Sequence, residues 1–159
     1  MGALPSSSPV DPPCEGRQRY RAVVDVHLVL RRDQKVLLGQ RKNTGYEDGK
    51  LHLPAGHLEE GESLVDALAR EAKEELGILI SPEDVVFAHI MHNRSSQGRI
   101  ASFFEITNWD GEPQNMEPEK CAGVSWFDLM HLPENIVGYA KYALDQYAMG
   151  NPFSEYGWR

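Results

Sequence analysis

The sequence predicts one α/β domain in which a mixed β-sheet lies between helical layers. Segments rich in β-branched and aliphatic residues, which favour strands, occur in both halves of the chain. Two amphipathic segments with helical spacing lie among them, and strands that mostly precede or surround two helices favour a sandwich. The 159 residues suffice for a single core. We assign residues 17–159 to this domain and residues 1–16, rich in Pro, Ser and Gly, to a flexible leader.

The first half of the domain is expected to begin with two strands. Residues 20–30 are mostly aliphatic and alternate in part, which predicts a largely buried strand. A turn at Asp33 and Gln34 leads to a second strand at residues 36–41. Residues 43–50 carry two glycines among polar neighbours, which indicates an exposed loop.

The strongest helix signal lies between Ser63 and Gly77. Ser63, with Asp66 three positions later, is typical of a capping box, and Gly77 is typical of a helix C-terminus. An apolar stripe at helical spacing predicts that one face packs on the sheet; it comprises Val65, Leu68, Ala69, Ala72 and Leu76.

The second half of the domain is expected to contain three strands and a second helix. Residues 84–92 and 100–107 suit a hairpin, and residues 123–127 suit a short strand. Residues 137–149 predict an amphipathic helix, whose expected inner side comprises Val137, Ala140, Ala143, Leu144, Tyr147 and Ala148.

Composition and charge restrict the partners. A net charge of −8 and a pI near 5.2 argue against binding a nucleic-acid polymer, whereas a small phosphate-bearing molecule can still bind through cations. Two cysteines without metal-ligand spacing suggest reduced thiols in a cytoplasmic protein. No apolar stretch is long enough for a membrane span, so no membrane partner is expected.

The aromatic tail at residues 151–159 is expected to dock on the domain or on a second subunit, which leaves a homodimer open.

Three carboxylates lie close together in the first predicted helix. Glu71, Glu74 and Glu75 are three and four residues apart, so at 100° per residue they share one patch. Arg70 and Lys73 offset their repulsion only partly, whereas divalent cations would relieve it. Carboxylate oxygens are preferred ligands of Mg²⁺ and Mn²⁺. The alternative is a solvated helix face with salt bridges.

The spacing upstream of these carboxylates favours the metal site. The segment that begins at Gly56 is GHLEEGESLVDALAREAKEELGI, in which five residues separate Gly56 from Glu62 and seven separate Glu62 from Arg70. With Glu71, Glu74, Glu75 and Gly77 at their set positions, the segment resembles the Nudix box. Ala72 departs from the pattern because the family usually has a larger aliphatic residue there.

The resemblance to the Nudix family implies an α/β/α sandwich that binds Mg²⁺ or Mn²⁺ and hydrolyses a pyrophosphate linkage in a nucleotide-like substrate. It implies metal ligation by Glu71, Glu74 and Glu75, with Glu71 or Glu74 as the catalytic base. By the same resemblance, Arg70 orients a glutamate and Glu62 ties the loop to the helix.

The turn before the box resembles the Pro-Gly-Gly turn of the family. Leu53-Pro54-Ala55-Gly56 places Ala55 where relatives have the first glycine, whose backbone carbonyl is a metal ligand in many of them. Ala55 suits this role only if its φ angle is negative, because alanine strongly resists positive φ.

Four residues outside the box are candidates for substrate binding. Arg41 could bind a phosphate or lie on the surface. Glu117 and Glu119, in an acidic loop at residues 109–120, could add a carboxylate or be solvated. Trp126 could wall a base pocket or pack in the core. The histidines show no metal-ligand spacing and are expected to be structural or exposed; they are His27, His52, His57, His89, His92 and His131.

Three functional hypotheses follow from the resemblance. The first is a MutT-like hydrolase of a nucleoside triphosphate or a modified nucleotide, because the Pro and Tyr expected downstream of the box in the ADP-ribose and diadenosine-polyphosphate branches are absent near Asn93 to Ser96. The alternative within the enzyme class is an ADP-ribose or nucleotide-sugar pyrophosphatase. The third is a non-catalytic nucleotide sensor, which the intact glutamates disfavour.

Overall fold

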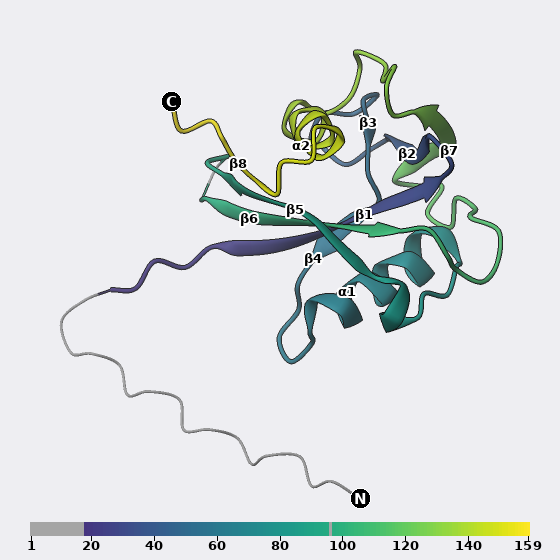
Figure 1. Cartoon of the computed structure of the whole chain (residues 1–159), viewed down its shortest axis with the longest axis horizontal. Coiled ribbons are helices and arrows are strands. Elements are labelled where there is room, and N and C mark those ends of the chain that lie inside the picture. The colour runs from purple at the N-terminus through teal and green to yellow at the C-terminus, as the bar shows by residue number, and fades with distance from the viewer. Residues whose placement is uncertain (1–17, 96) are drawn as a thin grey trace, which may run out of the picture.

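The computed structural model describes residues 18–95 and 97–159, so the predicted leader at residues 1–16 lies outside the described residues. Helix α1 and helix α2 cover opposite faces of a mixed sheet (Figure 1), which confirms the predicted sandwich. The strands are β1 (Val23–Arg32), β2 (Lys35–Arg41), β3 (Leu51–His52), β4 (Ala55–His57), β5 (Val86–Asn93), β6 (Arg99–Ile106), β7 (Cys121–Asp128) and β8 (Phe153–Tyr156). The helices are α1 (Leu64–Glu71) and α2 (Gly138–Ala148).

Strand β1 forms the centre of the sheet. The strand order is β3-β2-β1-β6-β5-β8, with β4 also paired to β1 and β7 to β2. The β1–β6 and β5–β8 pairs are parallel and the other pairs are antiparallel. Side chains alternate along β1, so Val26, Leu28 and Leu30 enter the core beneath α1, while Val29 enters the core beneath α2. Burial on both faces explains the nearly continuous apolar sequence of β1.

Helix α1 begins where the sequence predicts, and a π-helical turn continues it to the predicted end at Gly77. Ser63 Oγ accepts from the Asp66 backbone N–H at 3.1 Å, and the Asp66 carboxylate accepts from the Ser63 backbone N–H at 3.3 Å. The last turn, Ala72–Leu76, is π-helical and ends at Gly77, whose φ is 69°. The predicted apolar stripe is wrong at Val65 and Ala69, which are only partly buried, because Ala67 packs into the core instead.

The second half of the chain confirms the predicted hairpin and helix. Strands β5 and β6 pair antiparallel, and Val137, Ala140, Ala143 and Leu144 bury one side of α2. Tyr147 packs against the same core, whereas Ala148 is exposed, so the predicted inner side is wrong only at Ala148. The aromatic tail docks on its own domain, as β8, in parallel with β5. No helix in the described part of the chain is long and apolar enough to cross a membrane.

Candidate active site

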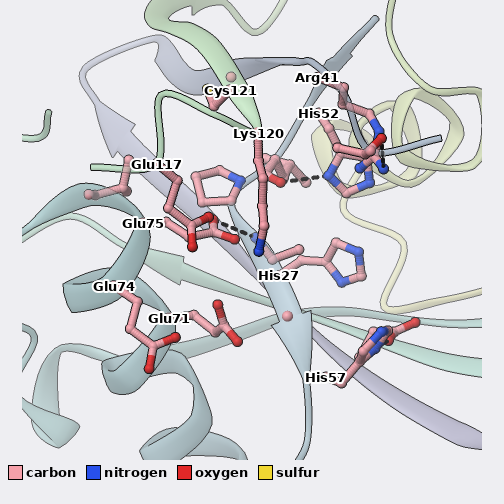
Figure 2. A pocket seen from close by; sticks show the side chains of 18 of the residues that line it. His27, Arg41, His52, His57, Glu71, Glu74, Glu75, Glu117, Lys120 and Cys121 are labelled. Atoms are coloured by element: carbon pink, nitrogen blue, oxygen red, sulfur yellow. Dashed lines mark hydrogen bonds and ion pairs between the residues drawn. The ribbon is translucent and has the colours of Figure 1, made fainter. Parts of the chain in front are cut away.

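A cavity of about 840 Å³ lies beside α1 and the turn that precedes it. Its size is typical of small-molecule sites. Figure 2 shows Glu71, Glu74, Glu75 and Glu117 on one side of the cavity and Arg41 and His52 on the other, with Lys120 between them in this view. We call the group of Glu71, Glu74, Glu75 and Glu117 the acidic end, and the group of His27, His52 and Tyr139 the imidazole end.

The side chains of the acidic end come from the helix and from the loop at residues 109–120, which are held together by backbone hydrogen bonds. The backbone N–H of Gln114 donates to Leu76 O, and that of Met116 donates to Glu75 O, each at 3.0 Å. These bonds satisfy carbonyls at the end of the helix, which has no further turn to accept them. They also bring Glu117 beside the box carboxylates, so its charge acts on both Glu71 and Glu75.

Glu71 is buried against Gly56. Only 8% of Glu71 is exposed, and a Cβ atom added to Gly56 would stand 1.8 Å from Glu71 Oε1. Any side chain at Gly56 would therefore displace the Glu71 carboxylate. Gly56 is needed here for this close approach and not for a positive φ.

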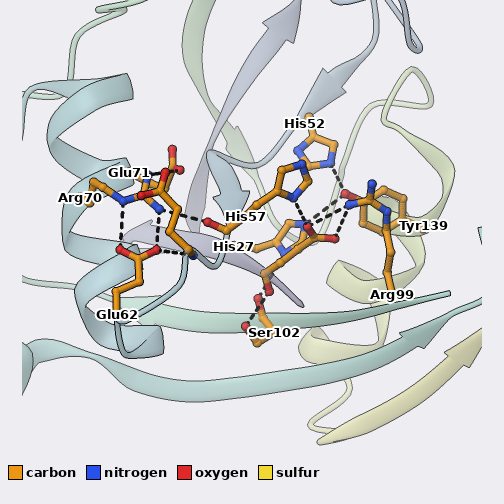
Figure 3. Close-up of polar contacts among 11 residues, drawn as sticks. His27, His52, His57, Glu62, Arg70, Glu71, Arg99, Ser102 and Tyr139 are labelled. Atoms are coloured by element: carbon orange, nitrogen blue, oxygen red, sulfur yellow. Dashed lines mark hydrogen bonds and ion pairs between the residues drawn. The ribbon is translucent and has the colours of Figure 1, made fainter. Parts of the chain in front are cut away.

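Arg70 holds the box together by its guanidinium (Figure 3). It donates to Glu62 through Nη2 at 2.7 Å and Nε at 3.1 Å, and to Glu71 Oε1 through Nη1 at 2.7 Å. Glu62 also accepts from the Glu59 backbone N–H at 2.7 Å, so Glu62 links the loop to the helix. The Arg70 hydrogen bond is the main cause that lowers the pKa of Glu62.

Burial and like charge disfavour the ionised forms of Glu71 and Glu75. The pKa of Glu75 is raised to about 8, mainly by burial and then by Glu71 and Glu117. Burial also raises the pKa of Glu71, although Arg70 opposes the shift. The Ala55 backbone N–H donates to Glu75 Oε2 at 3.2 Å, and Ala55 has no positive φ, as its proposed role requires.

The carboxylate oxygens of the acidic end are of the type that binds divalent metal ions. Among residues 18–95 and 97–159, no three His, Cys, Asp or Glu side chains are already gathered around one metal position. The acidic end nevertheless concentrates oxygen donors whose repulsion a cation would relieve, and a site that uses few protein ligands is typical of Mg²⁺ bound together with substrate phosphate.

The imidazole end contains residues that sequence reasoning missed as cavity residues. His27 and His52 are buried, as expected of structural histidines, yet both line the cavity and both contact the Tyr139 hydroxyl. One signal was available: His27, like Asp25 two residues earlier, interrupts a mostly apolar run in β1. Nothing local in the sequence indicates that Tyr139, on α2, reaches the same place.

A second group missed from the sequence lies beside the box. His57 Nδ1 donates to Asp25 Oδ1 at 2.5 Å, and Arg99 Nη1 donates to both Asp25 oxygens at 3.0 Å. All three residues line the cavity. The buried Asp25 carboxylate is therefore satisfied by two partners.

The four predicted substrate residues separate into two groups. Arg41 and Glu117 line the cavity, and Lys120, which the sequence did not single out, joins them. Glu119 and Trp126 lie outside the lining. Trp126 stacks on Trp109 at a ring-centroid distance of 6.1 Å and packs on the core beneath α1, so the structure favours its core interpretation.

The fold and the cavity are those of an α/β/α-sandwich enzyme, in which carboxylates on a helix face a cavity large enough for a small-molecule ligand. The sequence model of the NUDIX domain matches residues 19–147, and the chain belongs to the Nudix family. It is a hydrolase of phosphorus-containing acid anhydrides, and enzymes of this family generally use divalent metal ions.

Relatives carry several different substrate names. The chain is 31% identical over 123 residues to the ADP-ribose pyrophosphatase of Methanocaldococcus jannaschii, which covers 77% of this chain and 71% of that protein. It is 37% identical over 75 residues to the CTP pyrophosphohydrolase of Escherichia coli, covering 47% of this chain and 53% of that protein. The crystal structure of a MutT NUDIX hydrolase from Burkholderia pseudomallei superposes with a TM-score of 0.71 at 27% identity, covering 79% of this chain and 98% of that chain.

Proposed function

We propose that this chain hydrolyses a pyrophosphate bond in a nucleoside triphosphate or a modified nucleotide. The observation that carries the proposal is that one cavity has two chemically different ends. The acidic end suits a metal-bound pyrophosphate, and the imidazole end suits a planar, polar organic group. A substrate that joins a nucleoside to a pyrophosphate has both parts.

Glu71, Glu74, Glu75 and the Ala55 carbonyl would hold Mg²⁺ or Mn²⁺. When bound, such ions neutralise phosphate oxygens and lower the pKa of an attacking water. The chain's own contribution is positioning, which supplies most of the catalysis in phosphoryl-type transfer.

We assign separate roles in positioning and proton transfer to individual residues. Glu71 or Glu74 would accept the proton of the attacking water, and Arg70 keeps Glu71 in one orientation. Arg41 lies over the Tyr46 ring at 5.3 Å and is fixed to the loop by a bond from its Nε to Tyr46 O at 2.7 Å. Arg41 is therefore preorganised to bind a phosphate at the cavity wall, together with Lys120.

The second candidate is hydrolysis of ADP-ribose or of a nucleotide sugar. The name of the Methanocaldococcus jannaschii relative favours it. The same two ends of the cavity would serve, because ADP-ribose also joins a nucleoside to a pyrophosphate. A non-catalytic sensor is disfavoured because Glu71, Glu74 and Glu75 are all present and Arg70 already orients Glu71.

We place the protein in the cytoplasm, with a small-molecule nucleotide as its partner. The docked tail does not require a homodimer, because β8 pairs within its own domain. Light scattering coupled to size exclusion would test the oligomeric state.

A chromatographic product screen tests the proposal, because hydrolysis of a pyrophosphate bond need not release free phosphate. Nucleoside triphosphates, damaged nucleotides, ADP-ribose and nucleotide sugars are each supplied with Mg²⁺ or Mn²⁺, and Glu74→Gln serves as the inactive control. We expect the highest kcat/KM for a triphosphate or a modified nucleotide. A kcat/KM for ADP-ribose at least about tenfold above that of every triphosphate would favour the second candidate, and tenfold corresponds to about 1.4 kcal/mol. Absence of turnover with every compound would refute both.

A further inference from the structure

Tyr46 is an exposed aromatic residue on the wall of the cavity. It lies in the loop between β2 and β3, and 51% of the residue is exposed. Tyr139, the other tyrosine that lines the cavity, is only partly exposed, and its ring packs against the rings of His27 and His52. Tyr46 therefore offers the larger exposed aromatic surface to a ligand.

One face of the Tyr46 ring is covered by Arg41. The guanidinium carbon of Arg41 lies 5.3 Å from the ring centroid. Arg41 Nε also donates to Tyr46 O at 2.7 Å, and Arg41 Nη2 donates to Thr44 Oγ1 at 3.0 Å. A guanidinium over an aromatic ring is attracted to its π-electrons, so the contact holds the ring in one orientation. The exposed surface of Tyr46 therefore includes the opposite face of the ring.

Hydrogen bonds within the loop fix the backbone that carries Tyr46. The Asp48 carboxylate accepts from the backbone N–H of Thr44 at 3.0 Å, from Thr44 Oγ1 at 2.6 Å and from the backbone N–H of Gly45 at 3.1 Å. The backbone N–H of Gly49 donates to Arg41 O at 2.8 Å, which closes the loop where it leaves β2. Tyr46 is thus held in place before any ligand binds.

Two residues of this loop keep an unfavourable backbone conformation. The φ angles of Asn43 and Glu47 are 52° and 51°. This left-handed region costs free energy for residues that have a side chain, and it persists only where the surrounding contacts impose it. Glu47 follows Tyr46 directly, and its carboxylate pairs with Lys50. Backbone strain of this kind is concentrated at ligand-binding sites, which supports a binding role for the loop.

Tyr46 belongs to the side of the cavity that lies opposite the acidic end. Figure 2 shows Arg41 and His52 across the cavity from the box carboxylates, and Arg41 contacts Tyr46. If the acidic end holds the pyrophosphate, the nucleoside attached to it extends toward this opposite wall. A base that reaches the wall can stack on the exposed face of Tyr46, because every base has a π-face.

We propose that Tyr46 is the residue on which the base of the substrate stacks, and that Asp48 is a positioning residue that holds Tyr46 in place. Stacking recognises the presence of a base more than its identity. The substrates are then compounds that carry a nucleobase, whether a triphosphate or an ADP-linked molecule, and pyrophosphates without a base are poor substrates. The inference rests on the proposed function, since it assumes that a pyrophosphate binds at the acidic end.

Substrates that differ only in the base give the direct test. ATP and CTP are each compared with ribose 5-triphosphate, which keeps the sugar and the phosphate chain. For the wild-type protein we expect the better nucleotide to have a KM at least about tenfold below that of ribose 5-triphosphate, with kcat changed much less. Equal KM values for all three compounds would overturn the inference.

The substitution Tyr46→Leu removes the ring but keeps the backbone carbonyl that accepts from Arg41. The KM for the nucleotide should rise about tenfold, while that for ribose 5-triphosphate should change by less than about twofold. Tyr46→Phe keeps the ring and should keep the wild-type preference. The matched control is Tyr142→Leu, which replaces another exposed tyrosine outside the cavity lining and should also keep the preference. An equal rise in KM for both substrates in Tyr46→Leu would overturn the inference, because Tyr46 would then act on the phosphates through Arg41.

The substitution Asp48→Ala tests the positioning role. Without the carboxylate the loop must be ordered when the base binds, so the KM for the nucleotide should rise about threefold while that for ribose 5-triphosphate stays the same. Asp48→Asn keeps one oxygen that accepts from Thr44 and should restore part of the lost affinity. A loss of thermal stability in Asp48→Ala with an unchanged preference for the nucleotide would overturn the positioning role.

Binding of compounds without a pyrophosphate bond separates this inference from the proposed function. Calorimetry gives the Kd values of AMP, CMP and ribose 5-phosphate without turnover. Tighter binding of a nucleoside monophosphate that is lost in Tyr46→Leu, together with no turnover of any nucleotide, would refute the hydrolase function and support the stacking role. Turnover of nucleotides and of ribose 5-triphosphate with equal KM values would refute the stacking role and leave the hydrolase function standing.

Discussion

Both ends of the cavity contain buried polar groups, but these groups are stabilised in different ways. At the imidazole end, the side chains contact one another and backbone carbonyls. At the acidic end, Glu71, Glu75 and Glu117 repel one another, and Arg70 is the cation that binds Glu71. A neutral hydrogen-bonded cluster stabilises the fold. Carboxylates of like charge that lie close together destabilise it unless a cation binds to them.

This difference predicts opposite signs for polar deletions at the two ends. Removing a charge from the acidic end should relieve repulsion in the metal-free protein, while removing the shared hydroxyl from the imidazole end should leave buried ring nitrogens without their hydrogen-bond partner. We therefore expect the acidic end to lower the unfolding free energy while it supports activity. We expect the imidazole end to contribute to both stability and activity.

The largest effect is expected for Glu75→Gln. The substitution keeps the shape of the side chain and removes a candidate metal ligand, so kcat should fall by about 10²- to 10³-fold. Without metal the variant should be as stable as wild type or slightly more stable. The stabilisation that Mg²⁺ or Mn²⁺ gives by binding the folded state should largely disappear.

Thermal melts with and without metal measure the change in stability, and product release measures the change in kcat. An active variant with an undiminished metal-induced shift would show that Glu75 is no essential ligand; exposed Glu83→Gln is the control.

Gly56→Ala should damage the acidic end through packing alone. The added Cβ would collide with the Glu71 carboxylate, so we expect a loss of about 1 to 3 kcal/mol in unfolding free energy together with reduced kcat. Gly123→Ala is the matched control, because nothing lies within 4 Å of a Cβ atom at that position. Urea denaturation and turnover of both variants make the comparison. Equal stability of the two variants would contradict the close approach of Glu71 to Gly56.

Tyr139→Phe should destabilise the protein by about 1 to 3 kcal/mol, in contrast to Glu75→Gln. The reason is that the hydroxyl contacted by both His27 and His52 would be lost, which leaves a buried ring nitrogen without its hydrogen-bond partner. The loss should be the same with and without divalent metal, because the cluster is not at the acidic end. Urea denaturation under both conditions checks this. A variant as stable as wild type would indicate that Tyr139 does not satisfy the histidines.

The pH dependence of stability should also distinguish the two ends. The pKa of Glu75 is 4.5 in the unfolded chain and about 8 in the folded one, so the folded state binds more protons between these values. The unfolding free energy of metal-free protein should therefore fall as pH rises from about 4.5 to about 8, by at most about 1.4 kcal/mol per unit from this group. Urea denaturation in a chelator at several pH values measures the slope. Glu75→Gln should flatten it, and an unchanged slope would assign it to other groups.

The smallest effect is expected for Arg41→Lys, a residue of the cavity wall that belongs to neither end. Lysine keeps the charge but loses bidentate geometry, so KM should rise about tenfold with little change in kcat. Arg32→Lys is the control, because Arg32 lies over the Trp126 ring outside the cavity lining. Steady-state kinetics separate the two parameters. An unchanged KM would support the surface interpretation of Arg41.

The sequence alone determined the local elements and the box. The strands β1 and β2, both ends of α1, and the pattern of Gly56, Glu62, Arg70 and the three glutamates follow from neighbouring residues at fixed spacing. Such signals are readable because alternation, capping and helical periodicity act over a few residues.

Only the tertiary structure decided which distant residues share the cavity. His27, His52 and Tyr139 come from β1, β3 and α2, and 112 and 87 residues separate the two histidines from the tyrosine. Pairing of β7 with β2 packs Trp126 against the core beneath α1, and the loop that bonds to the π-helical turn brings Glu117 to the acidic end. Hydrogen bonding and burial between remote segments leave no local pattern in the sequence. The raised pKa of Glu75 and the contacts of both histidines with Tyr139 therefore follow only from the tertiary structure.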